Sequence, residues 1–171
     1  MNQKVLTVLE YNKIVEKLAA LASSPLGKEK ALKLQPSSDI ERINREQEET
    51  AHALNRLFKK DRVSFAHNKP LLRSIKTLEI GGSISAPELI LIADFLDNVR
   101  QVKAYGKEEK EEDRDVLTER FEALMPNIAL ADEIHRCILS EDEIADDASS
   151  NLKSIRRNIA ATNDRIRSQL N

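Results

Sequence analysis

The chain has 171 residues, a net charge of −2 and a composition that is 40% hydrophobic and 33% charged. These values exclude a disordered segment, and no apolar run is long enough for a signal peptide or a membrane span, so we expect a cytoplasmic protein without a membrane partner. The single Cys137 cannot form an internal disulfide, and 4% aromatic residues with abundant Leu, Ala, Glu, Lys and Arg predict a helical protein.

The first segment predicts two helices separated by proline. An apolar face with helical spacing runs from Tyr11 to Ala22 and should end at Ser23-Ser24-Pro25. Pro25 suits the start of a second, short helix through Lys28 to Leu34. This helix should stop at Gln35-Pro36, because the residue before a proline resists the helical conformation.

A capping box then predicts the start of a long helix. In Ser38-Asp39-Ile40-Glu41 we expect Ser38 to accept a hydrogen bond from the backbone and Glu41 to reach back. The helix behind it has a stripe with alternating spacings of three and four residues, which is typical of a bundle or coiled-coil helix. The stripe consists of Ile40, Ile43, Gln47, Thr50, Leu54 and Leu57.

The middle of the chain predicts a connector, a short helix and a central helix. Lys60 to Pro70 mixes polar and isolated apolar residues, and the following helix, from Leu71 to Leu78, should end at the C-cap Gly81-Gly82. Ser85-Ala86-Pro87-Glu88 is a second capping box. The apolar residues from Leu89 to Val102 cover more than half of the next helix, which we expect to be central.

After Gly106, the run Lys107 to Asp115 predicts a charged turn whose carboxylates are solvated. Two more helices should follow, Val116 to Leu124 and Ile128 to Leu139, separated by Pro126. No sustained alternation of apolar and polar residues is present. The chain is therefore predicted to be all-α, a multi-helix bundle with little or no sheet.

The last predicted helix begins at Ser149 and carries an apolar stripe without a local partner. The stripe consists of Leu152, Ile155, Ile159, Thr162, Ile166 and Leu170. We expect a fragment cut inside or just after a long helix, with a helical core bundle in residues 1–148 and the start of the long helix in residues 149–171.

The charges divide at the same place. Residues 1–148 hold 22 basic and 28 acidic residues, whereas residues 149–171 hold five basic residues and one acid. These five are the candidate nucleic-acid-binding residues Lys153, Arg156, Arg157, Arg165 and Arg167. At about 100° per residue, all but Arg165 fall within one arc beside the apolar stripe. Such a helix could lie along phosphates, or the charges could flank a coiled coil in solvent.

The search for catalytic and metal motifs predicts no such site in this chain. The Gly27-Lys28 pair lacks the upstream glycine and the downstream Ser or Thr of a phosphate-binding loop, since Ala22 and Glu29 occupy those places. His135 and Cys137 are too few for a zinc site, and Cys137 is expected to be a buried, inert thiol on the face of Leu130 and Ile134. The acidic runs lack the spacing of a calcium loop. We therefore expect no catalytic, cofactor-binding or metal-binding residue here.

Several motifs occur in an order that resembles one known family. They are Leu9-Glu10-Tyr11, Ser23-Ser24-Pro25-Leu26-Gly27, Leu34-Gln35-Pro36, Glu79-Ile80-Gly81-Gly82-Ser83-Ile84-Ser85 and Asp147-Ala148-Ser149 with Leu152, Ile155 and Arg156. Together they resemble the N-terminus of the nuclease-bearing second branch of MutS-like proteins, the MutS-two family. The similarity covers almost the whole chain.

The resemblance implies a longer homodimeric protein with a helical core, levers and clamp, a MutS-type ATPase domain that uses ATP and Mg, and a C-terminal Smr endonuclease domain. Members are associated with branched DNA and suppression of recombination, and in some bacteria with stalled ribosomes. This chain would be the start of the core, with residues 149–171 opening the lever. We expect the fragment itself to be a scaffold that couples ATPase to clamp, without enzymatic residues.

One departure from mismatch-repair relatives agrees with this assignment. Those proteins insert a Phe-x-Glu wedge at the mismatch, whereas none of the four phenylalanines here has that context. The rival hypothesis is a free-standing helical adaptor or coiled-coil interaction module without a catalytic partner.

Overall fold

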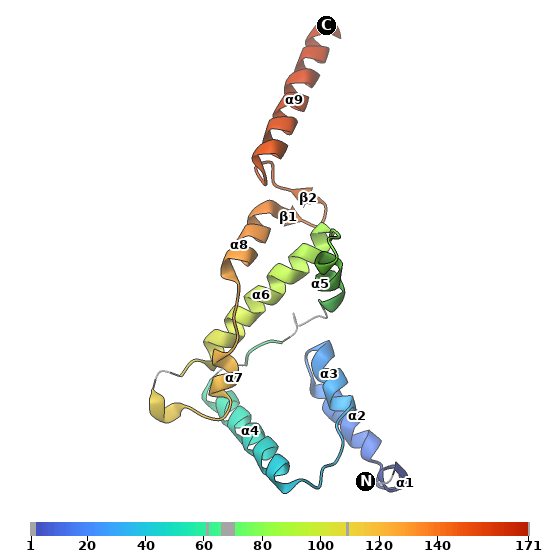
Figure 1. The fold of residues 1–171 in the computed structure, drawn as a ribbon, viewed down its shortest axis with the longest axis vertical. Coiled ribbons are helices and arrows are strands. Elements are labelled where there is room, and N and C mark those ends of the chain that lie inside the picture. The colour runs from blue at the N-terminus through green and yellow to red at the C-terminus, as the bar shows by residue number, and fades with distance from the viewer. Residues whose placement is uncertain (1–2, 61, 66–70, 109, 171) are drawn as a thin grey trace. The chain divides into compact units, whose positions relative to one another are not determined.

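The computed structural model describes residues 3–60, 62–65, 71–108 and 110–170. Its helices (Figure 1) are α1 (Gln3–Val8), α2 (Tyr11–Leu21), α3 (Pro25–Leu32), α4 (Ile40–Lys59), α5 (Leu72–Glu79), α6 (Ala86–Gly106), α7 (Thr118–Glu122), α8 (Ile128–Cys137) and α9 (Ser150–Leu170), with a 3₁₀ turn η1 (Glu111–Asp113). Two short strands, β1 (Ile138–Ser140) and β2 (Glu143–Ile144), form the described sheet. The prediction of an all-α chain with little sheet is confirmed.

The chain divides into two compact units. The first comprises Met1–Leu71 and Phe95–Pro126, and the second comprises Leu72–Asp94 and Asn127–Asn171, so that α6 has residues in both. The predicted boundary at residue 148 stays a prediction. Among the described helices, none has the length and apolar content needed to cross a membrane.

In the first unit, α2 packs against α1 and α3. Leu6, Val15 and Ala19 are buried in this small group. The third helix begins at Pro25, the residue predicted to start it, and Ser24 caps it by accepting a hydrogen bond from the Gly27 N–H at 3.0 Å. Proline fits the first helical position, where its missing N–H costs nothing.

The predicted N-cap of α4 is wrong by one residue. Asp39, and not Ser38, occupies the cap and accepts hydrogen bonds from the backbone N–H groups of Glu41 and Arg42, each at 3.1 Å. A carboxylate reaches the same donors as a hydroxyl, and its charge also interacts favourably with the helix dipole.

The face of α4 that packs is not its apolar stripe. Ile40, Leu54 and Leu57 of the stripe are 65%, 52% and 49% exposed. The buried side chain of this helix is Arg56, which lies on another face. The reason is electrostatic: Arg56 finds carboxylates and carbonyls in the segment after α6, and these bonds determine which face of α4 turns inward.

The expected central helix, α6, has few fully exposed residues. Ala93, Asn98 and Val102 are buried, and the Asn98 side chain donates a hydrogen bond to the Ser64 carbonyl at 2.7 Å. That carbonyl belongs to the predicted connector, of which residues 61 and 66–70 lie outside the described residues. The helix predicted over Val116 to Leu124 is shorter, since α7 covers only Thr118–Glu122.

In the second unit, the two predicted boundaries between α5 and α6 are confirmed. Gly81 has a φ of +76°, the left-handed conformation that ends many helices, and its N–H donates to the Leu78 carbonyl at 2.9 Å. Glu88 accepts hydrogen bonds from the backbone N–H and the hydroxyl of Ser85, both at 2.9 Å, as a capping box requires of its acidic residue. Ser74 of α5 donates to the same carboxylate.

The helix predicted over Ile128 to Leu139 ends at Cys137 and continues as a hairpin. Ile138 already has extended backbone angles, and it pairs with Ile144 of the antiparallel strand β2. The N–H of Ala145 then donates to the Cys137 carbonyl at 2.9 Å. Ala131 and Ile134 of α8 and Ala145, which follows β2, are buried.

Candidate nucleic-acid interface

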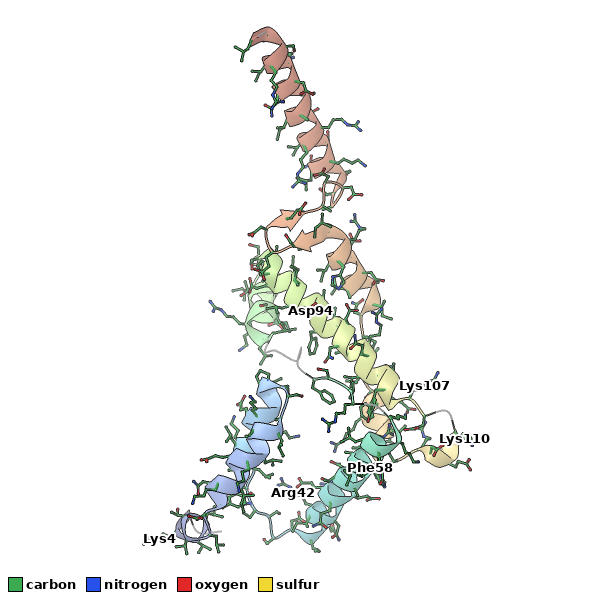
Figure 2. All side chains as sticks on the ribbon, turned by 180° about the vertical axis from the view of Figure 1, so that it is seen from behind. Lys4, Arg42, Phe58, Asp94, Lys107 and Lys110 are labelled. Atoms are coloured by element: carbon green, nitrogen blue, oxygen red, sulfur yellow. The ribbon has the colours of Figure 1, made fainter. Side chains whose placement is uncertain are left out.

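The last helix, α9, carries the candidate nucleic-acid-binding residues. Ser149 caps it by accepting a hydrogen bond from the Leu152 N–H at 3.1 Å. Its 21 residues correspond to a length of about 30 Å. All described residues after Leu152 are exposed, and Figure 2 shows side chains extending to both sides of this helix.

The apolar stripe of α9 is a surface and not a binding cavity. A shallow hollow along it is lined by Ile155, Asn158, Ile159, Thr162 and Asn163. All of these residues come from the one helix, so that no second element encloses the space. The stripe therefore offers a face for another helix to pack on and no pocket for a small molecule.

The structure divides the five predicted basic residues into two groups. Arg156 forms an ion pair with Asp146 and donates a hydrogen bond to the Ile144 carbonyl at 2.9 Å. Within the described chain, no carboxylate pairs with the other four, Lys153, Arg157, Arg165 and Arg167. Four exposed cations along one helix can meet a polyanion without first breaking an internal bond. That they bind nucleic acid stays a prediction.

The joint before α9, residues 145–149, is held from the α8 side by Arg136. Its guanidinium lies against Glu133 through two hydrogen bonds of 2.9 and 2.6 Å, and it donates to the carbonyls of Asp147 and Ala148 at 3.1 and 3.3 Å. The hydrogen bonds from Arg136 lower the pKa of Glu133 to about 2. The carboxylate thus stays charged near neutral pH and fixes the direction of the guanidinium.

Cys137 is half-buried beside this pair, and not fully buried as predicted. Its Sγ lies 3.5 Å from Glu133 Oε1 and 3.7 Å from the Ala148 carbonyl, and Leu130, expected on the same buried face, is exposed. Burial and the adjacent carboxylate raise the pKa of the thiol, which keeps it protonated and a poor nucleophile. Among the described residues no group of His, Cys, Asp and Glu could hold a metal ion.

A second charged group, which the sequence did not predict, lies in the first unit. We call Arg56, Lys60, Glu108, Asp115 and Thr118 the Arg56 cluster. The Arg56 side chain is 4% exposed; it bonds both oxygens of Asp115 at 2.7 Å and pairs with Glu108 at 2.9 Å. Lys60 shares the same Glu108 carboxylate at 3.0 Å.

Neutral groups complete the surroundings of Arg56. Its guanidinium donates to the Gly106 carbonyl at 3.0 Å and to the Thr118 hydroxyl at 2.9 Å, and it lies 5.0 Å from the centre of the Phe121 ring. The hydrogen bonds from Arg56 lower the pKa of Asp115 to about 2. With both partners charged and hydrogen-bonded, burial of the pair is tolerated.

The prediction that the carboxylates of Lys107 to Asp115 are solvated is wrong for Glu108 and Asp115. One sequence signal could have located Asp115. Asp115 and Thr118 form a local turn, in which the Leu117 N–H donates to the Asp115 carboxylate and the Asp115 N–H donates to the Thr118 hydroxyl, both at 2.9 Å. An acid followed three residues later by Thr marks such a turn. The partnership with Arg56, 59 residues away, has no local signal.

No family model matches the chain. The chain is 47% identical, over 99% of its length, to the protein named Endonuclease MutS2 of Lachnoclostridium phytofermentans. Its identity to the proteins of the same name from Agathobacter rectalis and Acetivibrio thermocellus is 45% and 39%, over 99% and 100% of the chain. The chain spans 22% of the length of each of these relatives. It belongs to the MutS2 family and represents an N-terminal segment of such a protein.

Proposed function

We propose that this chain is the helical core and the start of the lever of a homodimeric MutS2 protein, and that it couples an ATPase to a clamp. The ATPase, with its ATP and Mg, and the Smr endonuclease would lie in other parts of the longer protein. The proposed targets of the whole protein are branched DNA, in suppression of recombination, and stalled ribosomes, in the cytoplasm. The segment itself would act as a scaffold without catalytic residues.

The observation that carries this proposal is the exposure of α9. A continuous helix of 21 residues places its last residue about 30 Å from its first, and it presents an unpartnered apolar stripe along that length. An isolated amphipathic helix in water gains little from its apolar face. A lever that packs on another helix of a longer protein accounts for both features.

The apolar surfaces of the other helices support a scaffold role. Eight apolar side chains are buried among the described residues, and four of these are alanines. Large apolar side chains such as Leu21, Phe58, Leu72 and Ile80 are at least two-thirds exposed. Such surfaces mark packing sites for other protein segments. This pattern fits a segment that packs within a larger protein better than a free-standing adaptor.

The test uses two insertions at one place in the full-length protein. Gly-Pro inserted after Ile159 breaks the helix, whereas Ala-Ala inserted at the same place lengthens it without interrupting it. We expect the Gly-Pro variant to keep basal ATP hydrolysis and to lose the response of ATPase to nucleic acid or ribosomes. The Ala-Ala variant should keep part of that response. An unchanged response in the Gly-Pro variant would refute the lever role.

We further propose that the basic residues of α9 contact nucleic-acid phosphates, because four of the five have no internal carboxylate partner in the described chain. Each phosphate contact releases counterions, so that affinity falls with salt in proportion to the number of contacts. Replacing Arg156 and Arg157 by Ala should reduce the slope of log affinity against log salt by about 2. Arg42 and Arg45 of α4, replaced together, serve as the control. Equal slopes in both double variants would exclude the contact.

A further inference from the structure

Arg156 takes part in two features of the chain, the contact between α9 and the hairpin and the basic arc of α9. Its guanidinium binds Asp146 and the Ile144 carbonyl, and so ties α9 back to the hairpin. The same residue is a member of the basic arc, next to Arg157 and one helical turn from Lys153. A phosphate that recruits the arc would therefore compete with the hairpin for the same guanidinium.

The joint depends on side chains for its shape. Between β2 and α9 the N–H groups of Ala145 and Ala148 donate to the carbonyls of Cys137 and Ala145, at 2.9 and 3.1 Å, and the Ser149 carbonyl accepts from the first turn of α9 at 3.0 Å. Arg136 holds the carbonyls of Asp147 and Ala148 from one side, and Arg156 holds Ile144 and Asp146 from the other. Two arginines from different helices thus brace five linker residues, whose ordering costs conformational entropy.

The two halves of this brace differ in strength. Arg136 is fixed by two bonds to Glu133 and lies on α8, outside the basic arc. The two arginines are similarly exposed, 46% for Arg136 and 41% for Arg156, but Asp146 is 82% exposed against 58% for Glu133 and accepts only one bond from its arginine, so that water and salt screen the Arg156 pair more. A pair of this kind exchanges readily for another anion. Phosphate oxygens accept the same charge-assisted hydrogen bonds from arginine.

We propose that Arg156 is a latch: phosphates of a bound nucleic acid draw it from Asp146 and Ile144 and loosen the joint, while Arg136 keeps α8 attached. Binding to the arc and stiffness of the joint are then coupled. The coupling is reciprocal, so that a stiffer joint binds phosphate more weakly. This inference rests on the proposed nucleic-acid contact of α9. It adds that this contact regulates the stiffness of the joint before the lever.

The experiment is hydrogen–deuterium exchange of the full-length protein, read in peptides that contain Ala145, Ala148 and Leu152. The N–H groups of these residues are bonded in the closed joint. Short duplex DNA and short duplex RNA, added separately at low salt, are the two phosphate sources. We expect either duplex that binds to speed exchange in the joint about two- to fivefold, which is the fold-change that one exposed ion pair supplies.

Two neighbouring arginines provide the matched comparison. Arg156→Ala should speed exchange of the free protein by a similar factor, and bound nucleic acid should add nothing further. Arg157→Ala should weaken binding without changing exchange in the free protein. Asp146→Asn removes the competing carboxylate and should tighten nucleic-acid binding about two- to fivefold, the fold-change that one exposed ion pair supplies.

Unchanged joint exchange with nucleic acid bound to the wild-type protein would overturn the latch, as would equal exchange in the free Arg156→Ala and Arg157→Ala proteins. Failure of both duplexes to bind would overturn it together with the proposed phosphate contact. If only the lever role is wrong, the Gly-Pro insertion leaves the ATPase response unchanged. The exchange result is independent of that outcome.

Discussion

Two ion-paired arginines, Arg56 and Arg156, occupy opposite environments in this chain. Arg56 is almost inaccessible and bonds two carboxylates, a carbonyl and a hydroxyl. Arg156 pairs with one largely exposed carboxylate and one carbonyl. In both cases a guanidinium joins a helix to another segment of the chain. For Arg56 that segment is distant in sequence, and for Arg156 it is near. They differ in how much water reaches the bonds.

The difference teaches that burial decides whether an ion pair holds a structure or can be exchanged. Removing one partner of a buried pair leaves the other charge without solvent or counterion, which is costly. Removing one partner of an exposed pair returns the other to water at little cost. The Arg56 cluster is therefore suited to fix α4 to the segment after α6, and the Arg156 pair is suited to open.

The largest effect should come from Arg56→Ala. Asp115 and Glu108 would remain together in a poorly hydrated site, and we expect a loss of about 3–5 kcal/mol in the opening free energy of α4 and α7. Native-state hydrogen exchange in the full-length protein measures this locally. The exposed Arg42, which pairs with Glu46 at 2.8 Å, is the control, and Arg42→Ala should leave the opening free energy of α4 nearly unchanged. Equal losses of opening free energy in the Arg56 and Arg42 variants would contradict the distinction between buried and exposed ion pairs.

A smaller effect is expected from Gly106→Ala, which tests the packing around the same cluster. An added Cβ would lie 2.1 Å from the Cβ of Phe121, the ring that faces Arg56. The ring would have to move, at a cost of about 1–3 kcal/mol. Gly81→Ala is unsuitable as a control because of the positive φ of Gly81. Gly27→Ala is the control, since its added Cβ would mainly contact the Ser24 hydroxyl. Exchange rates in α7 should rise in the Gly106 variant and not in the Gly27 variant.

Lowering the pH should remove the contribution of Asp115 to the Arg56 cluster. The hydrogen bonds from Arg56 lower the Asp115 pKa from 3.8 to about 2, so its contribution is complete above about pH 4 and is lost as the pH falls through 2. We expect a loss of about 1–2 kcal/mol over this window, and none in Asp115→Asn.

Salt completes this test. Glu133 has a pKa lowered to about 2 by Arg136, but it is exposed, so its contribution falls in the same window and should disappear at about 1 M salt. The Asp115 contribution should persist. Exchange rates of α7 and α8, corrected for intrinsic rates, report the two carboxylates separately. Loss of both contributions in salt would mean that burial does not shield Asp115.

The smallest effect should follow Asp146→Asn, which removes the carboxylate partner of Arg156. Because the pair is exposed, the global stability of the protein should change by no more than about 0.5 kcal/mol. The thermal midpoint of the full-length protein checks this. A loss as large as that of Arg56→Ala would mean that the joint is a structural lock like the Arg56 cluster.

Local sequence signals predicted the elements well where the causes are local. Gly81, Glu88 and the residues around Pro25 and Pro36 specify helix ends through bonds that span a few positions, and the structure has ends at or near each of them. The same signals failed for Ser38, where the neighbouring Asp39 offered a charged alternative. They also missed the hairpin, whose two strands contain only five residues.

By itself, the sequence determined the helical class, most helix boundaries, the basic character of α9 and membership in the MutS2 family, because these depend on spacing, capping and similarity along the chain. Only the tertiary structure decided that Arg56, and not the stripe of α4, is buried, and that Arg156 alone of the basic arc has an internal carboxylate among the described residues. Both outcomes depend on which charges meet in space, and periodicity carries no information about partners such as Asp115, 59 residues from Arg56.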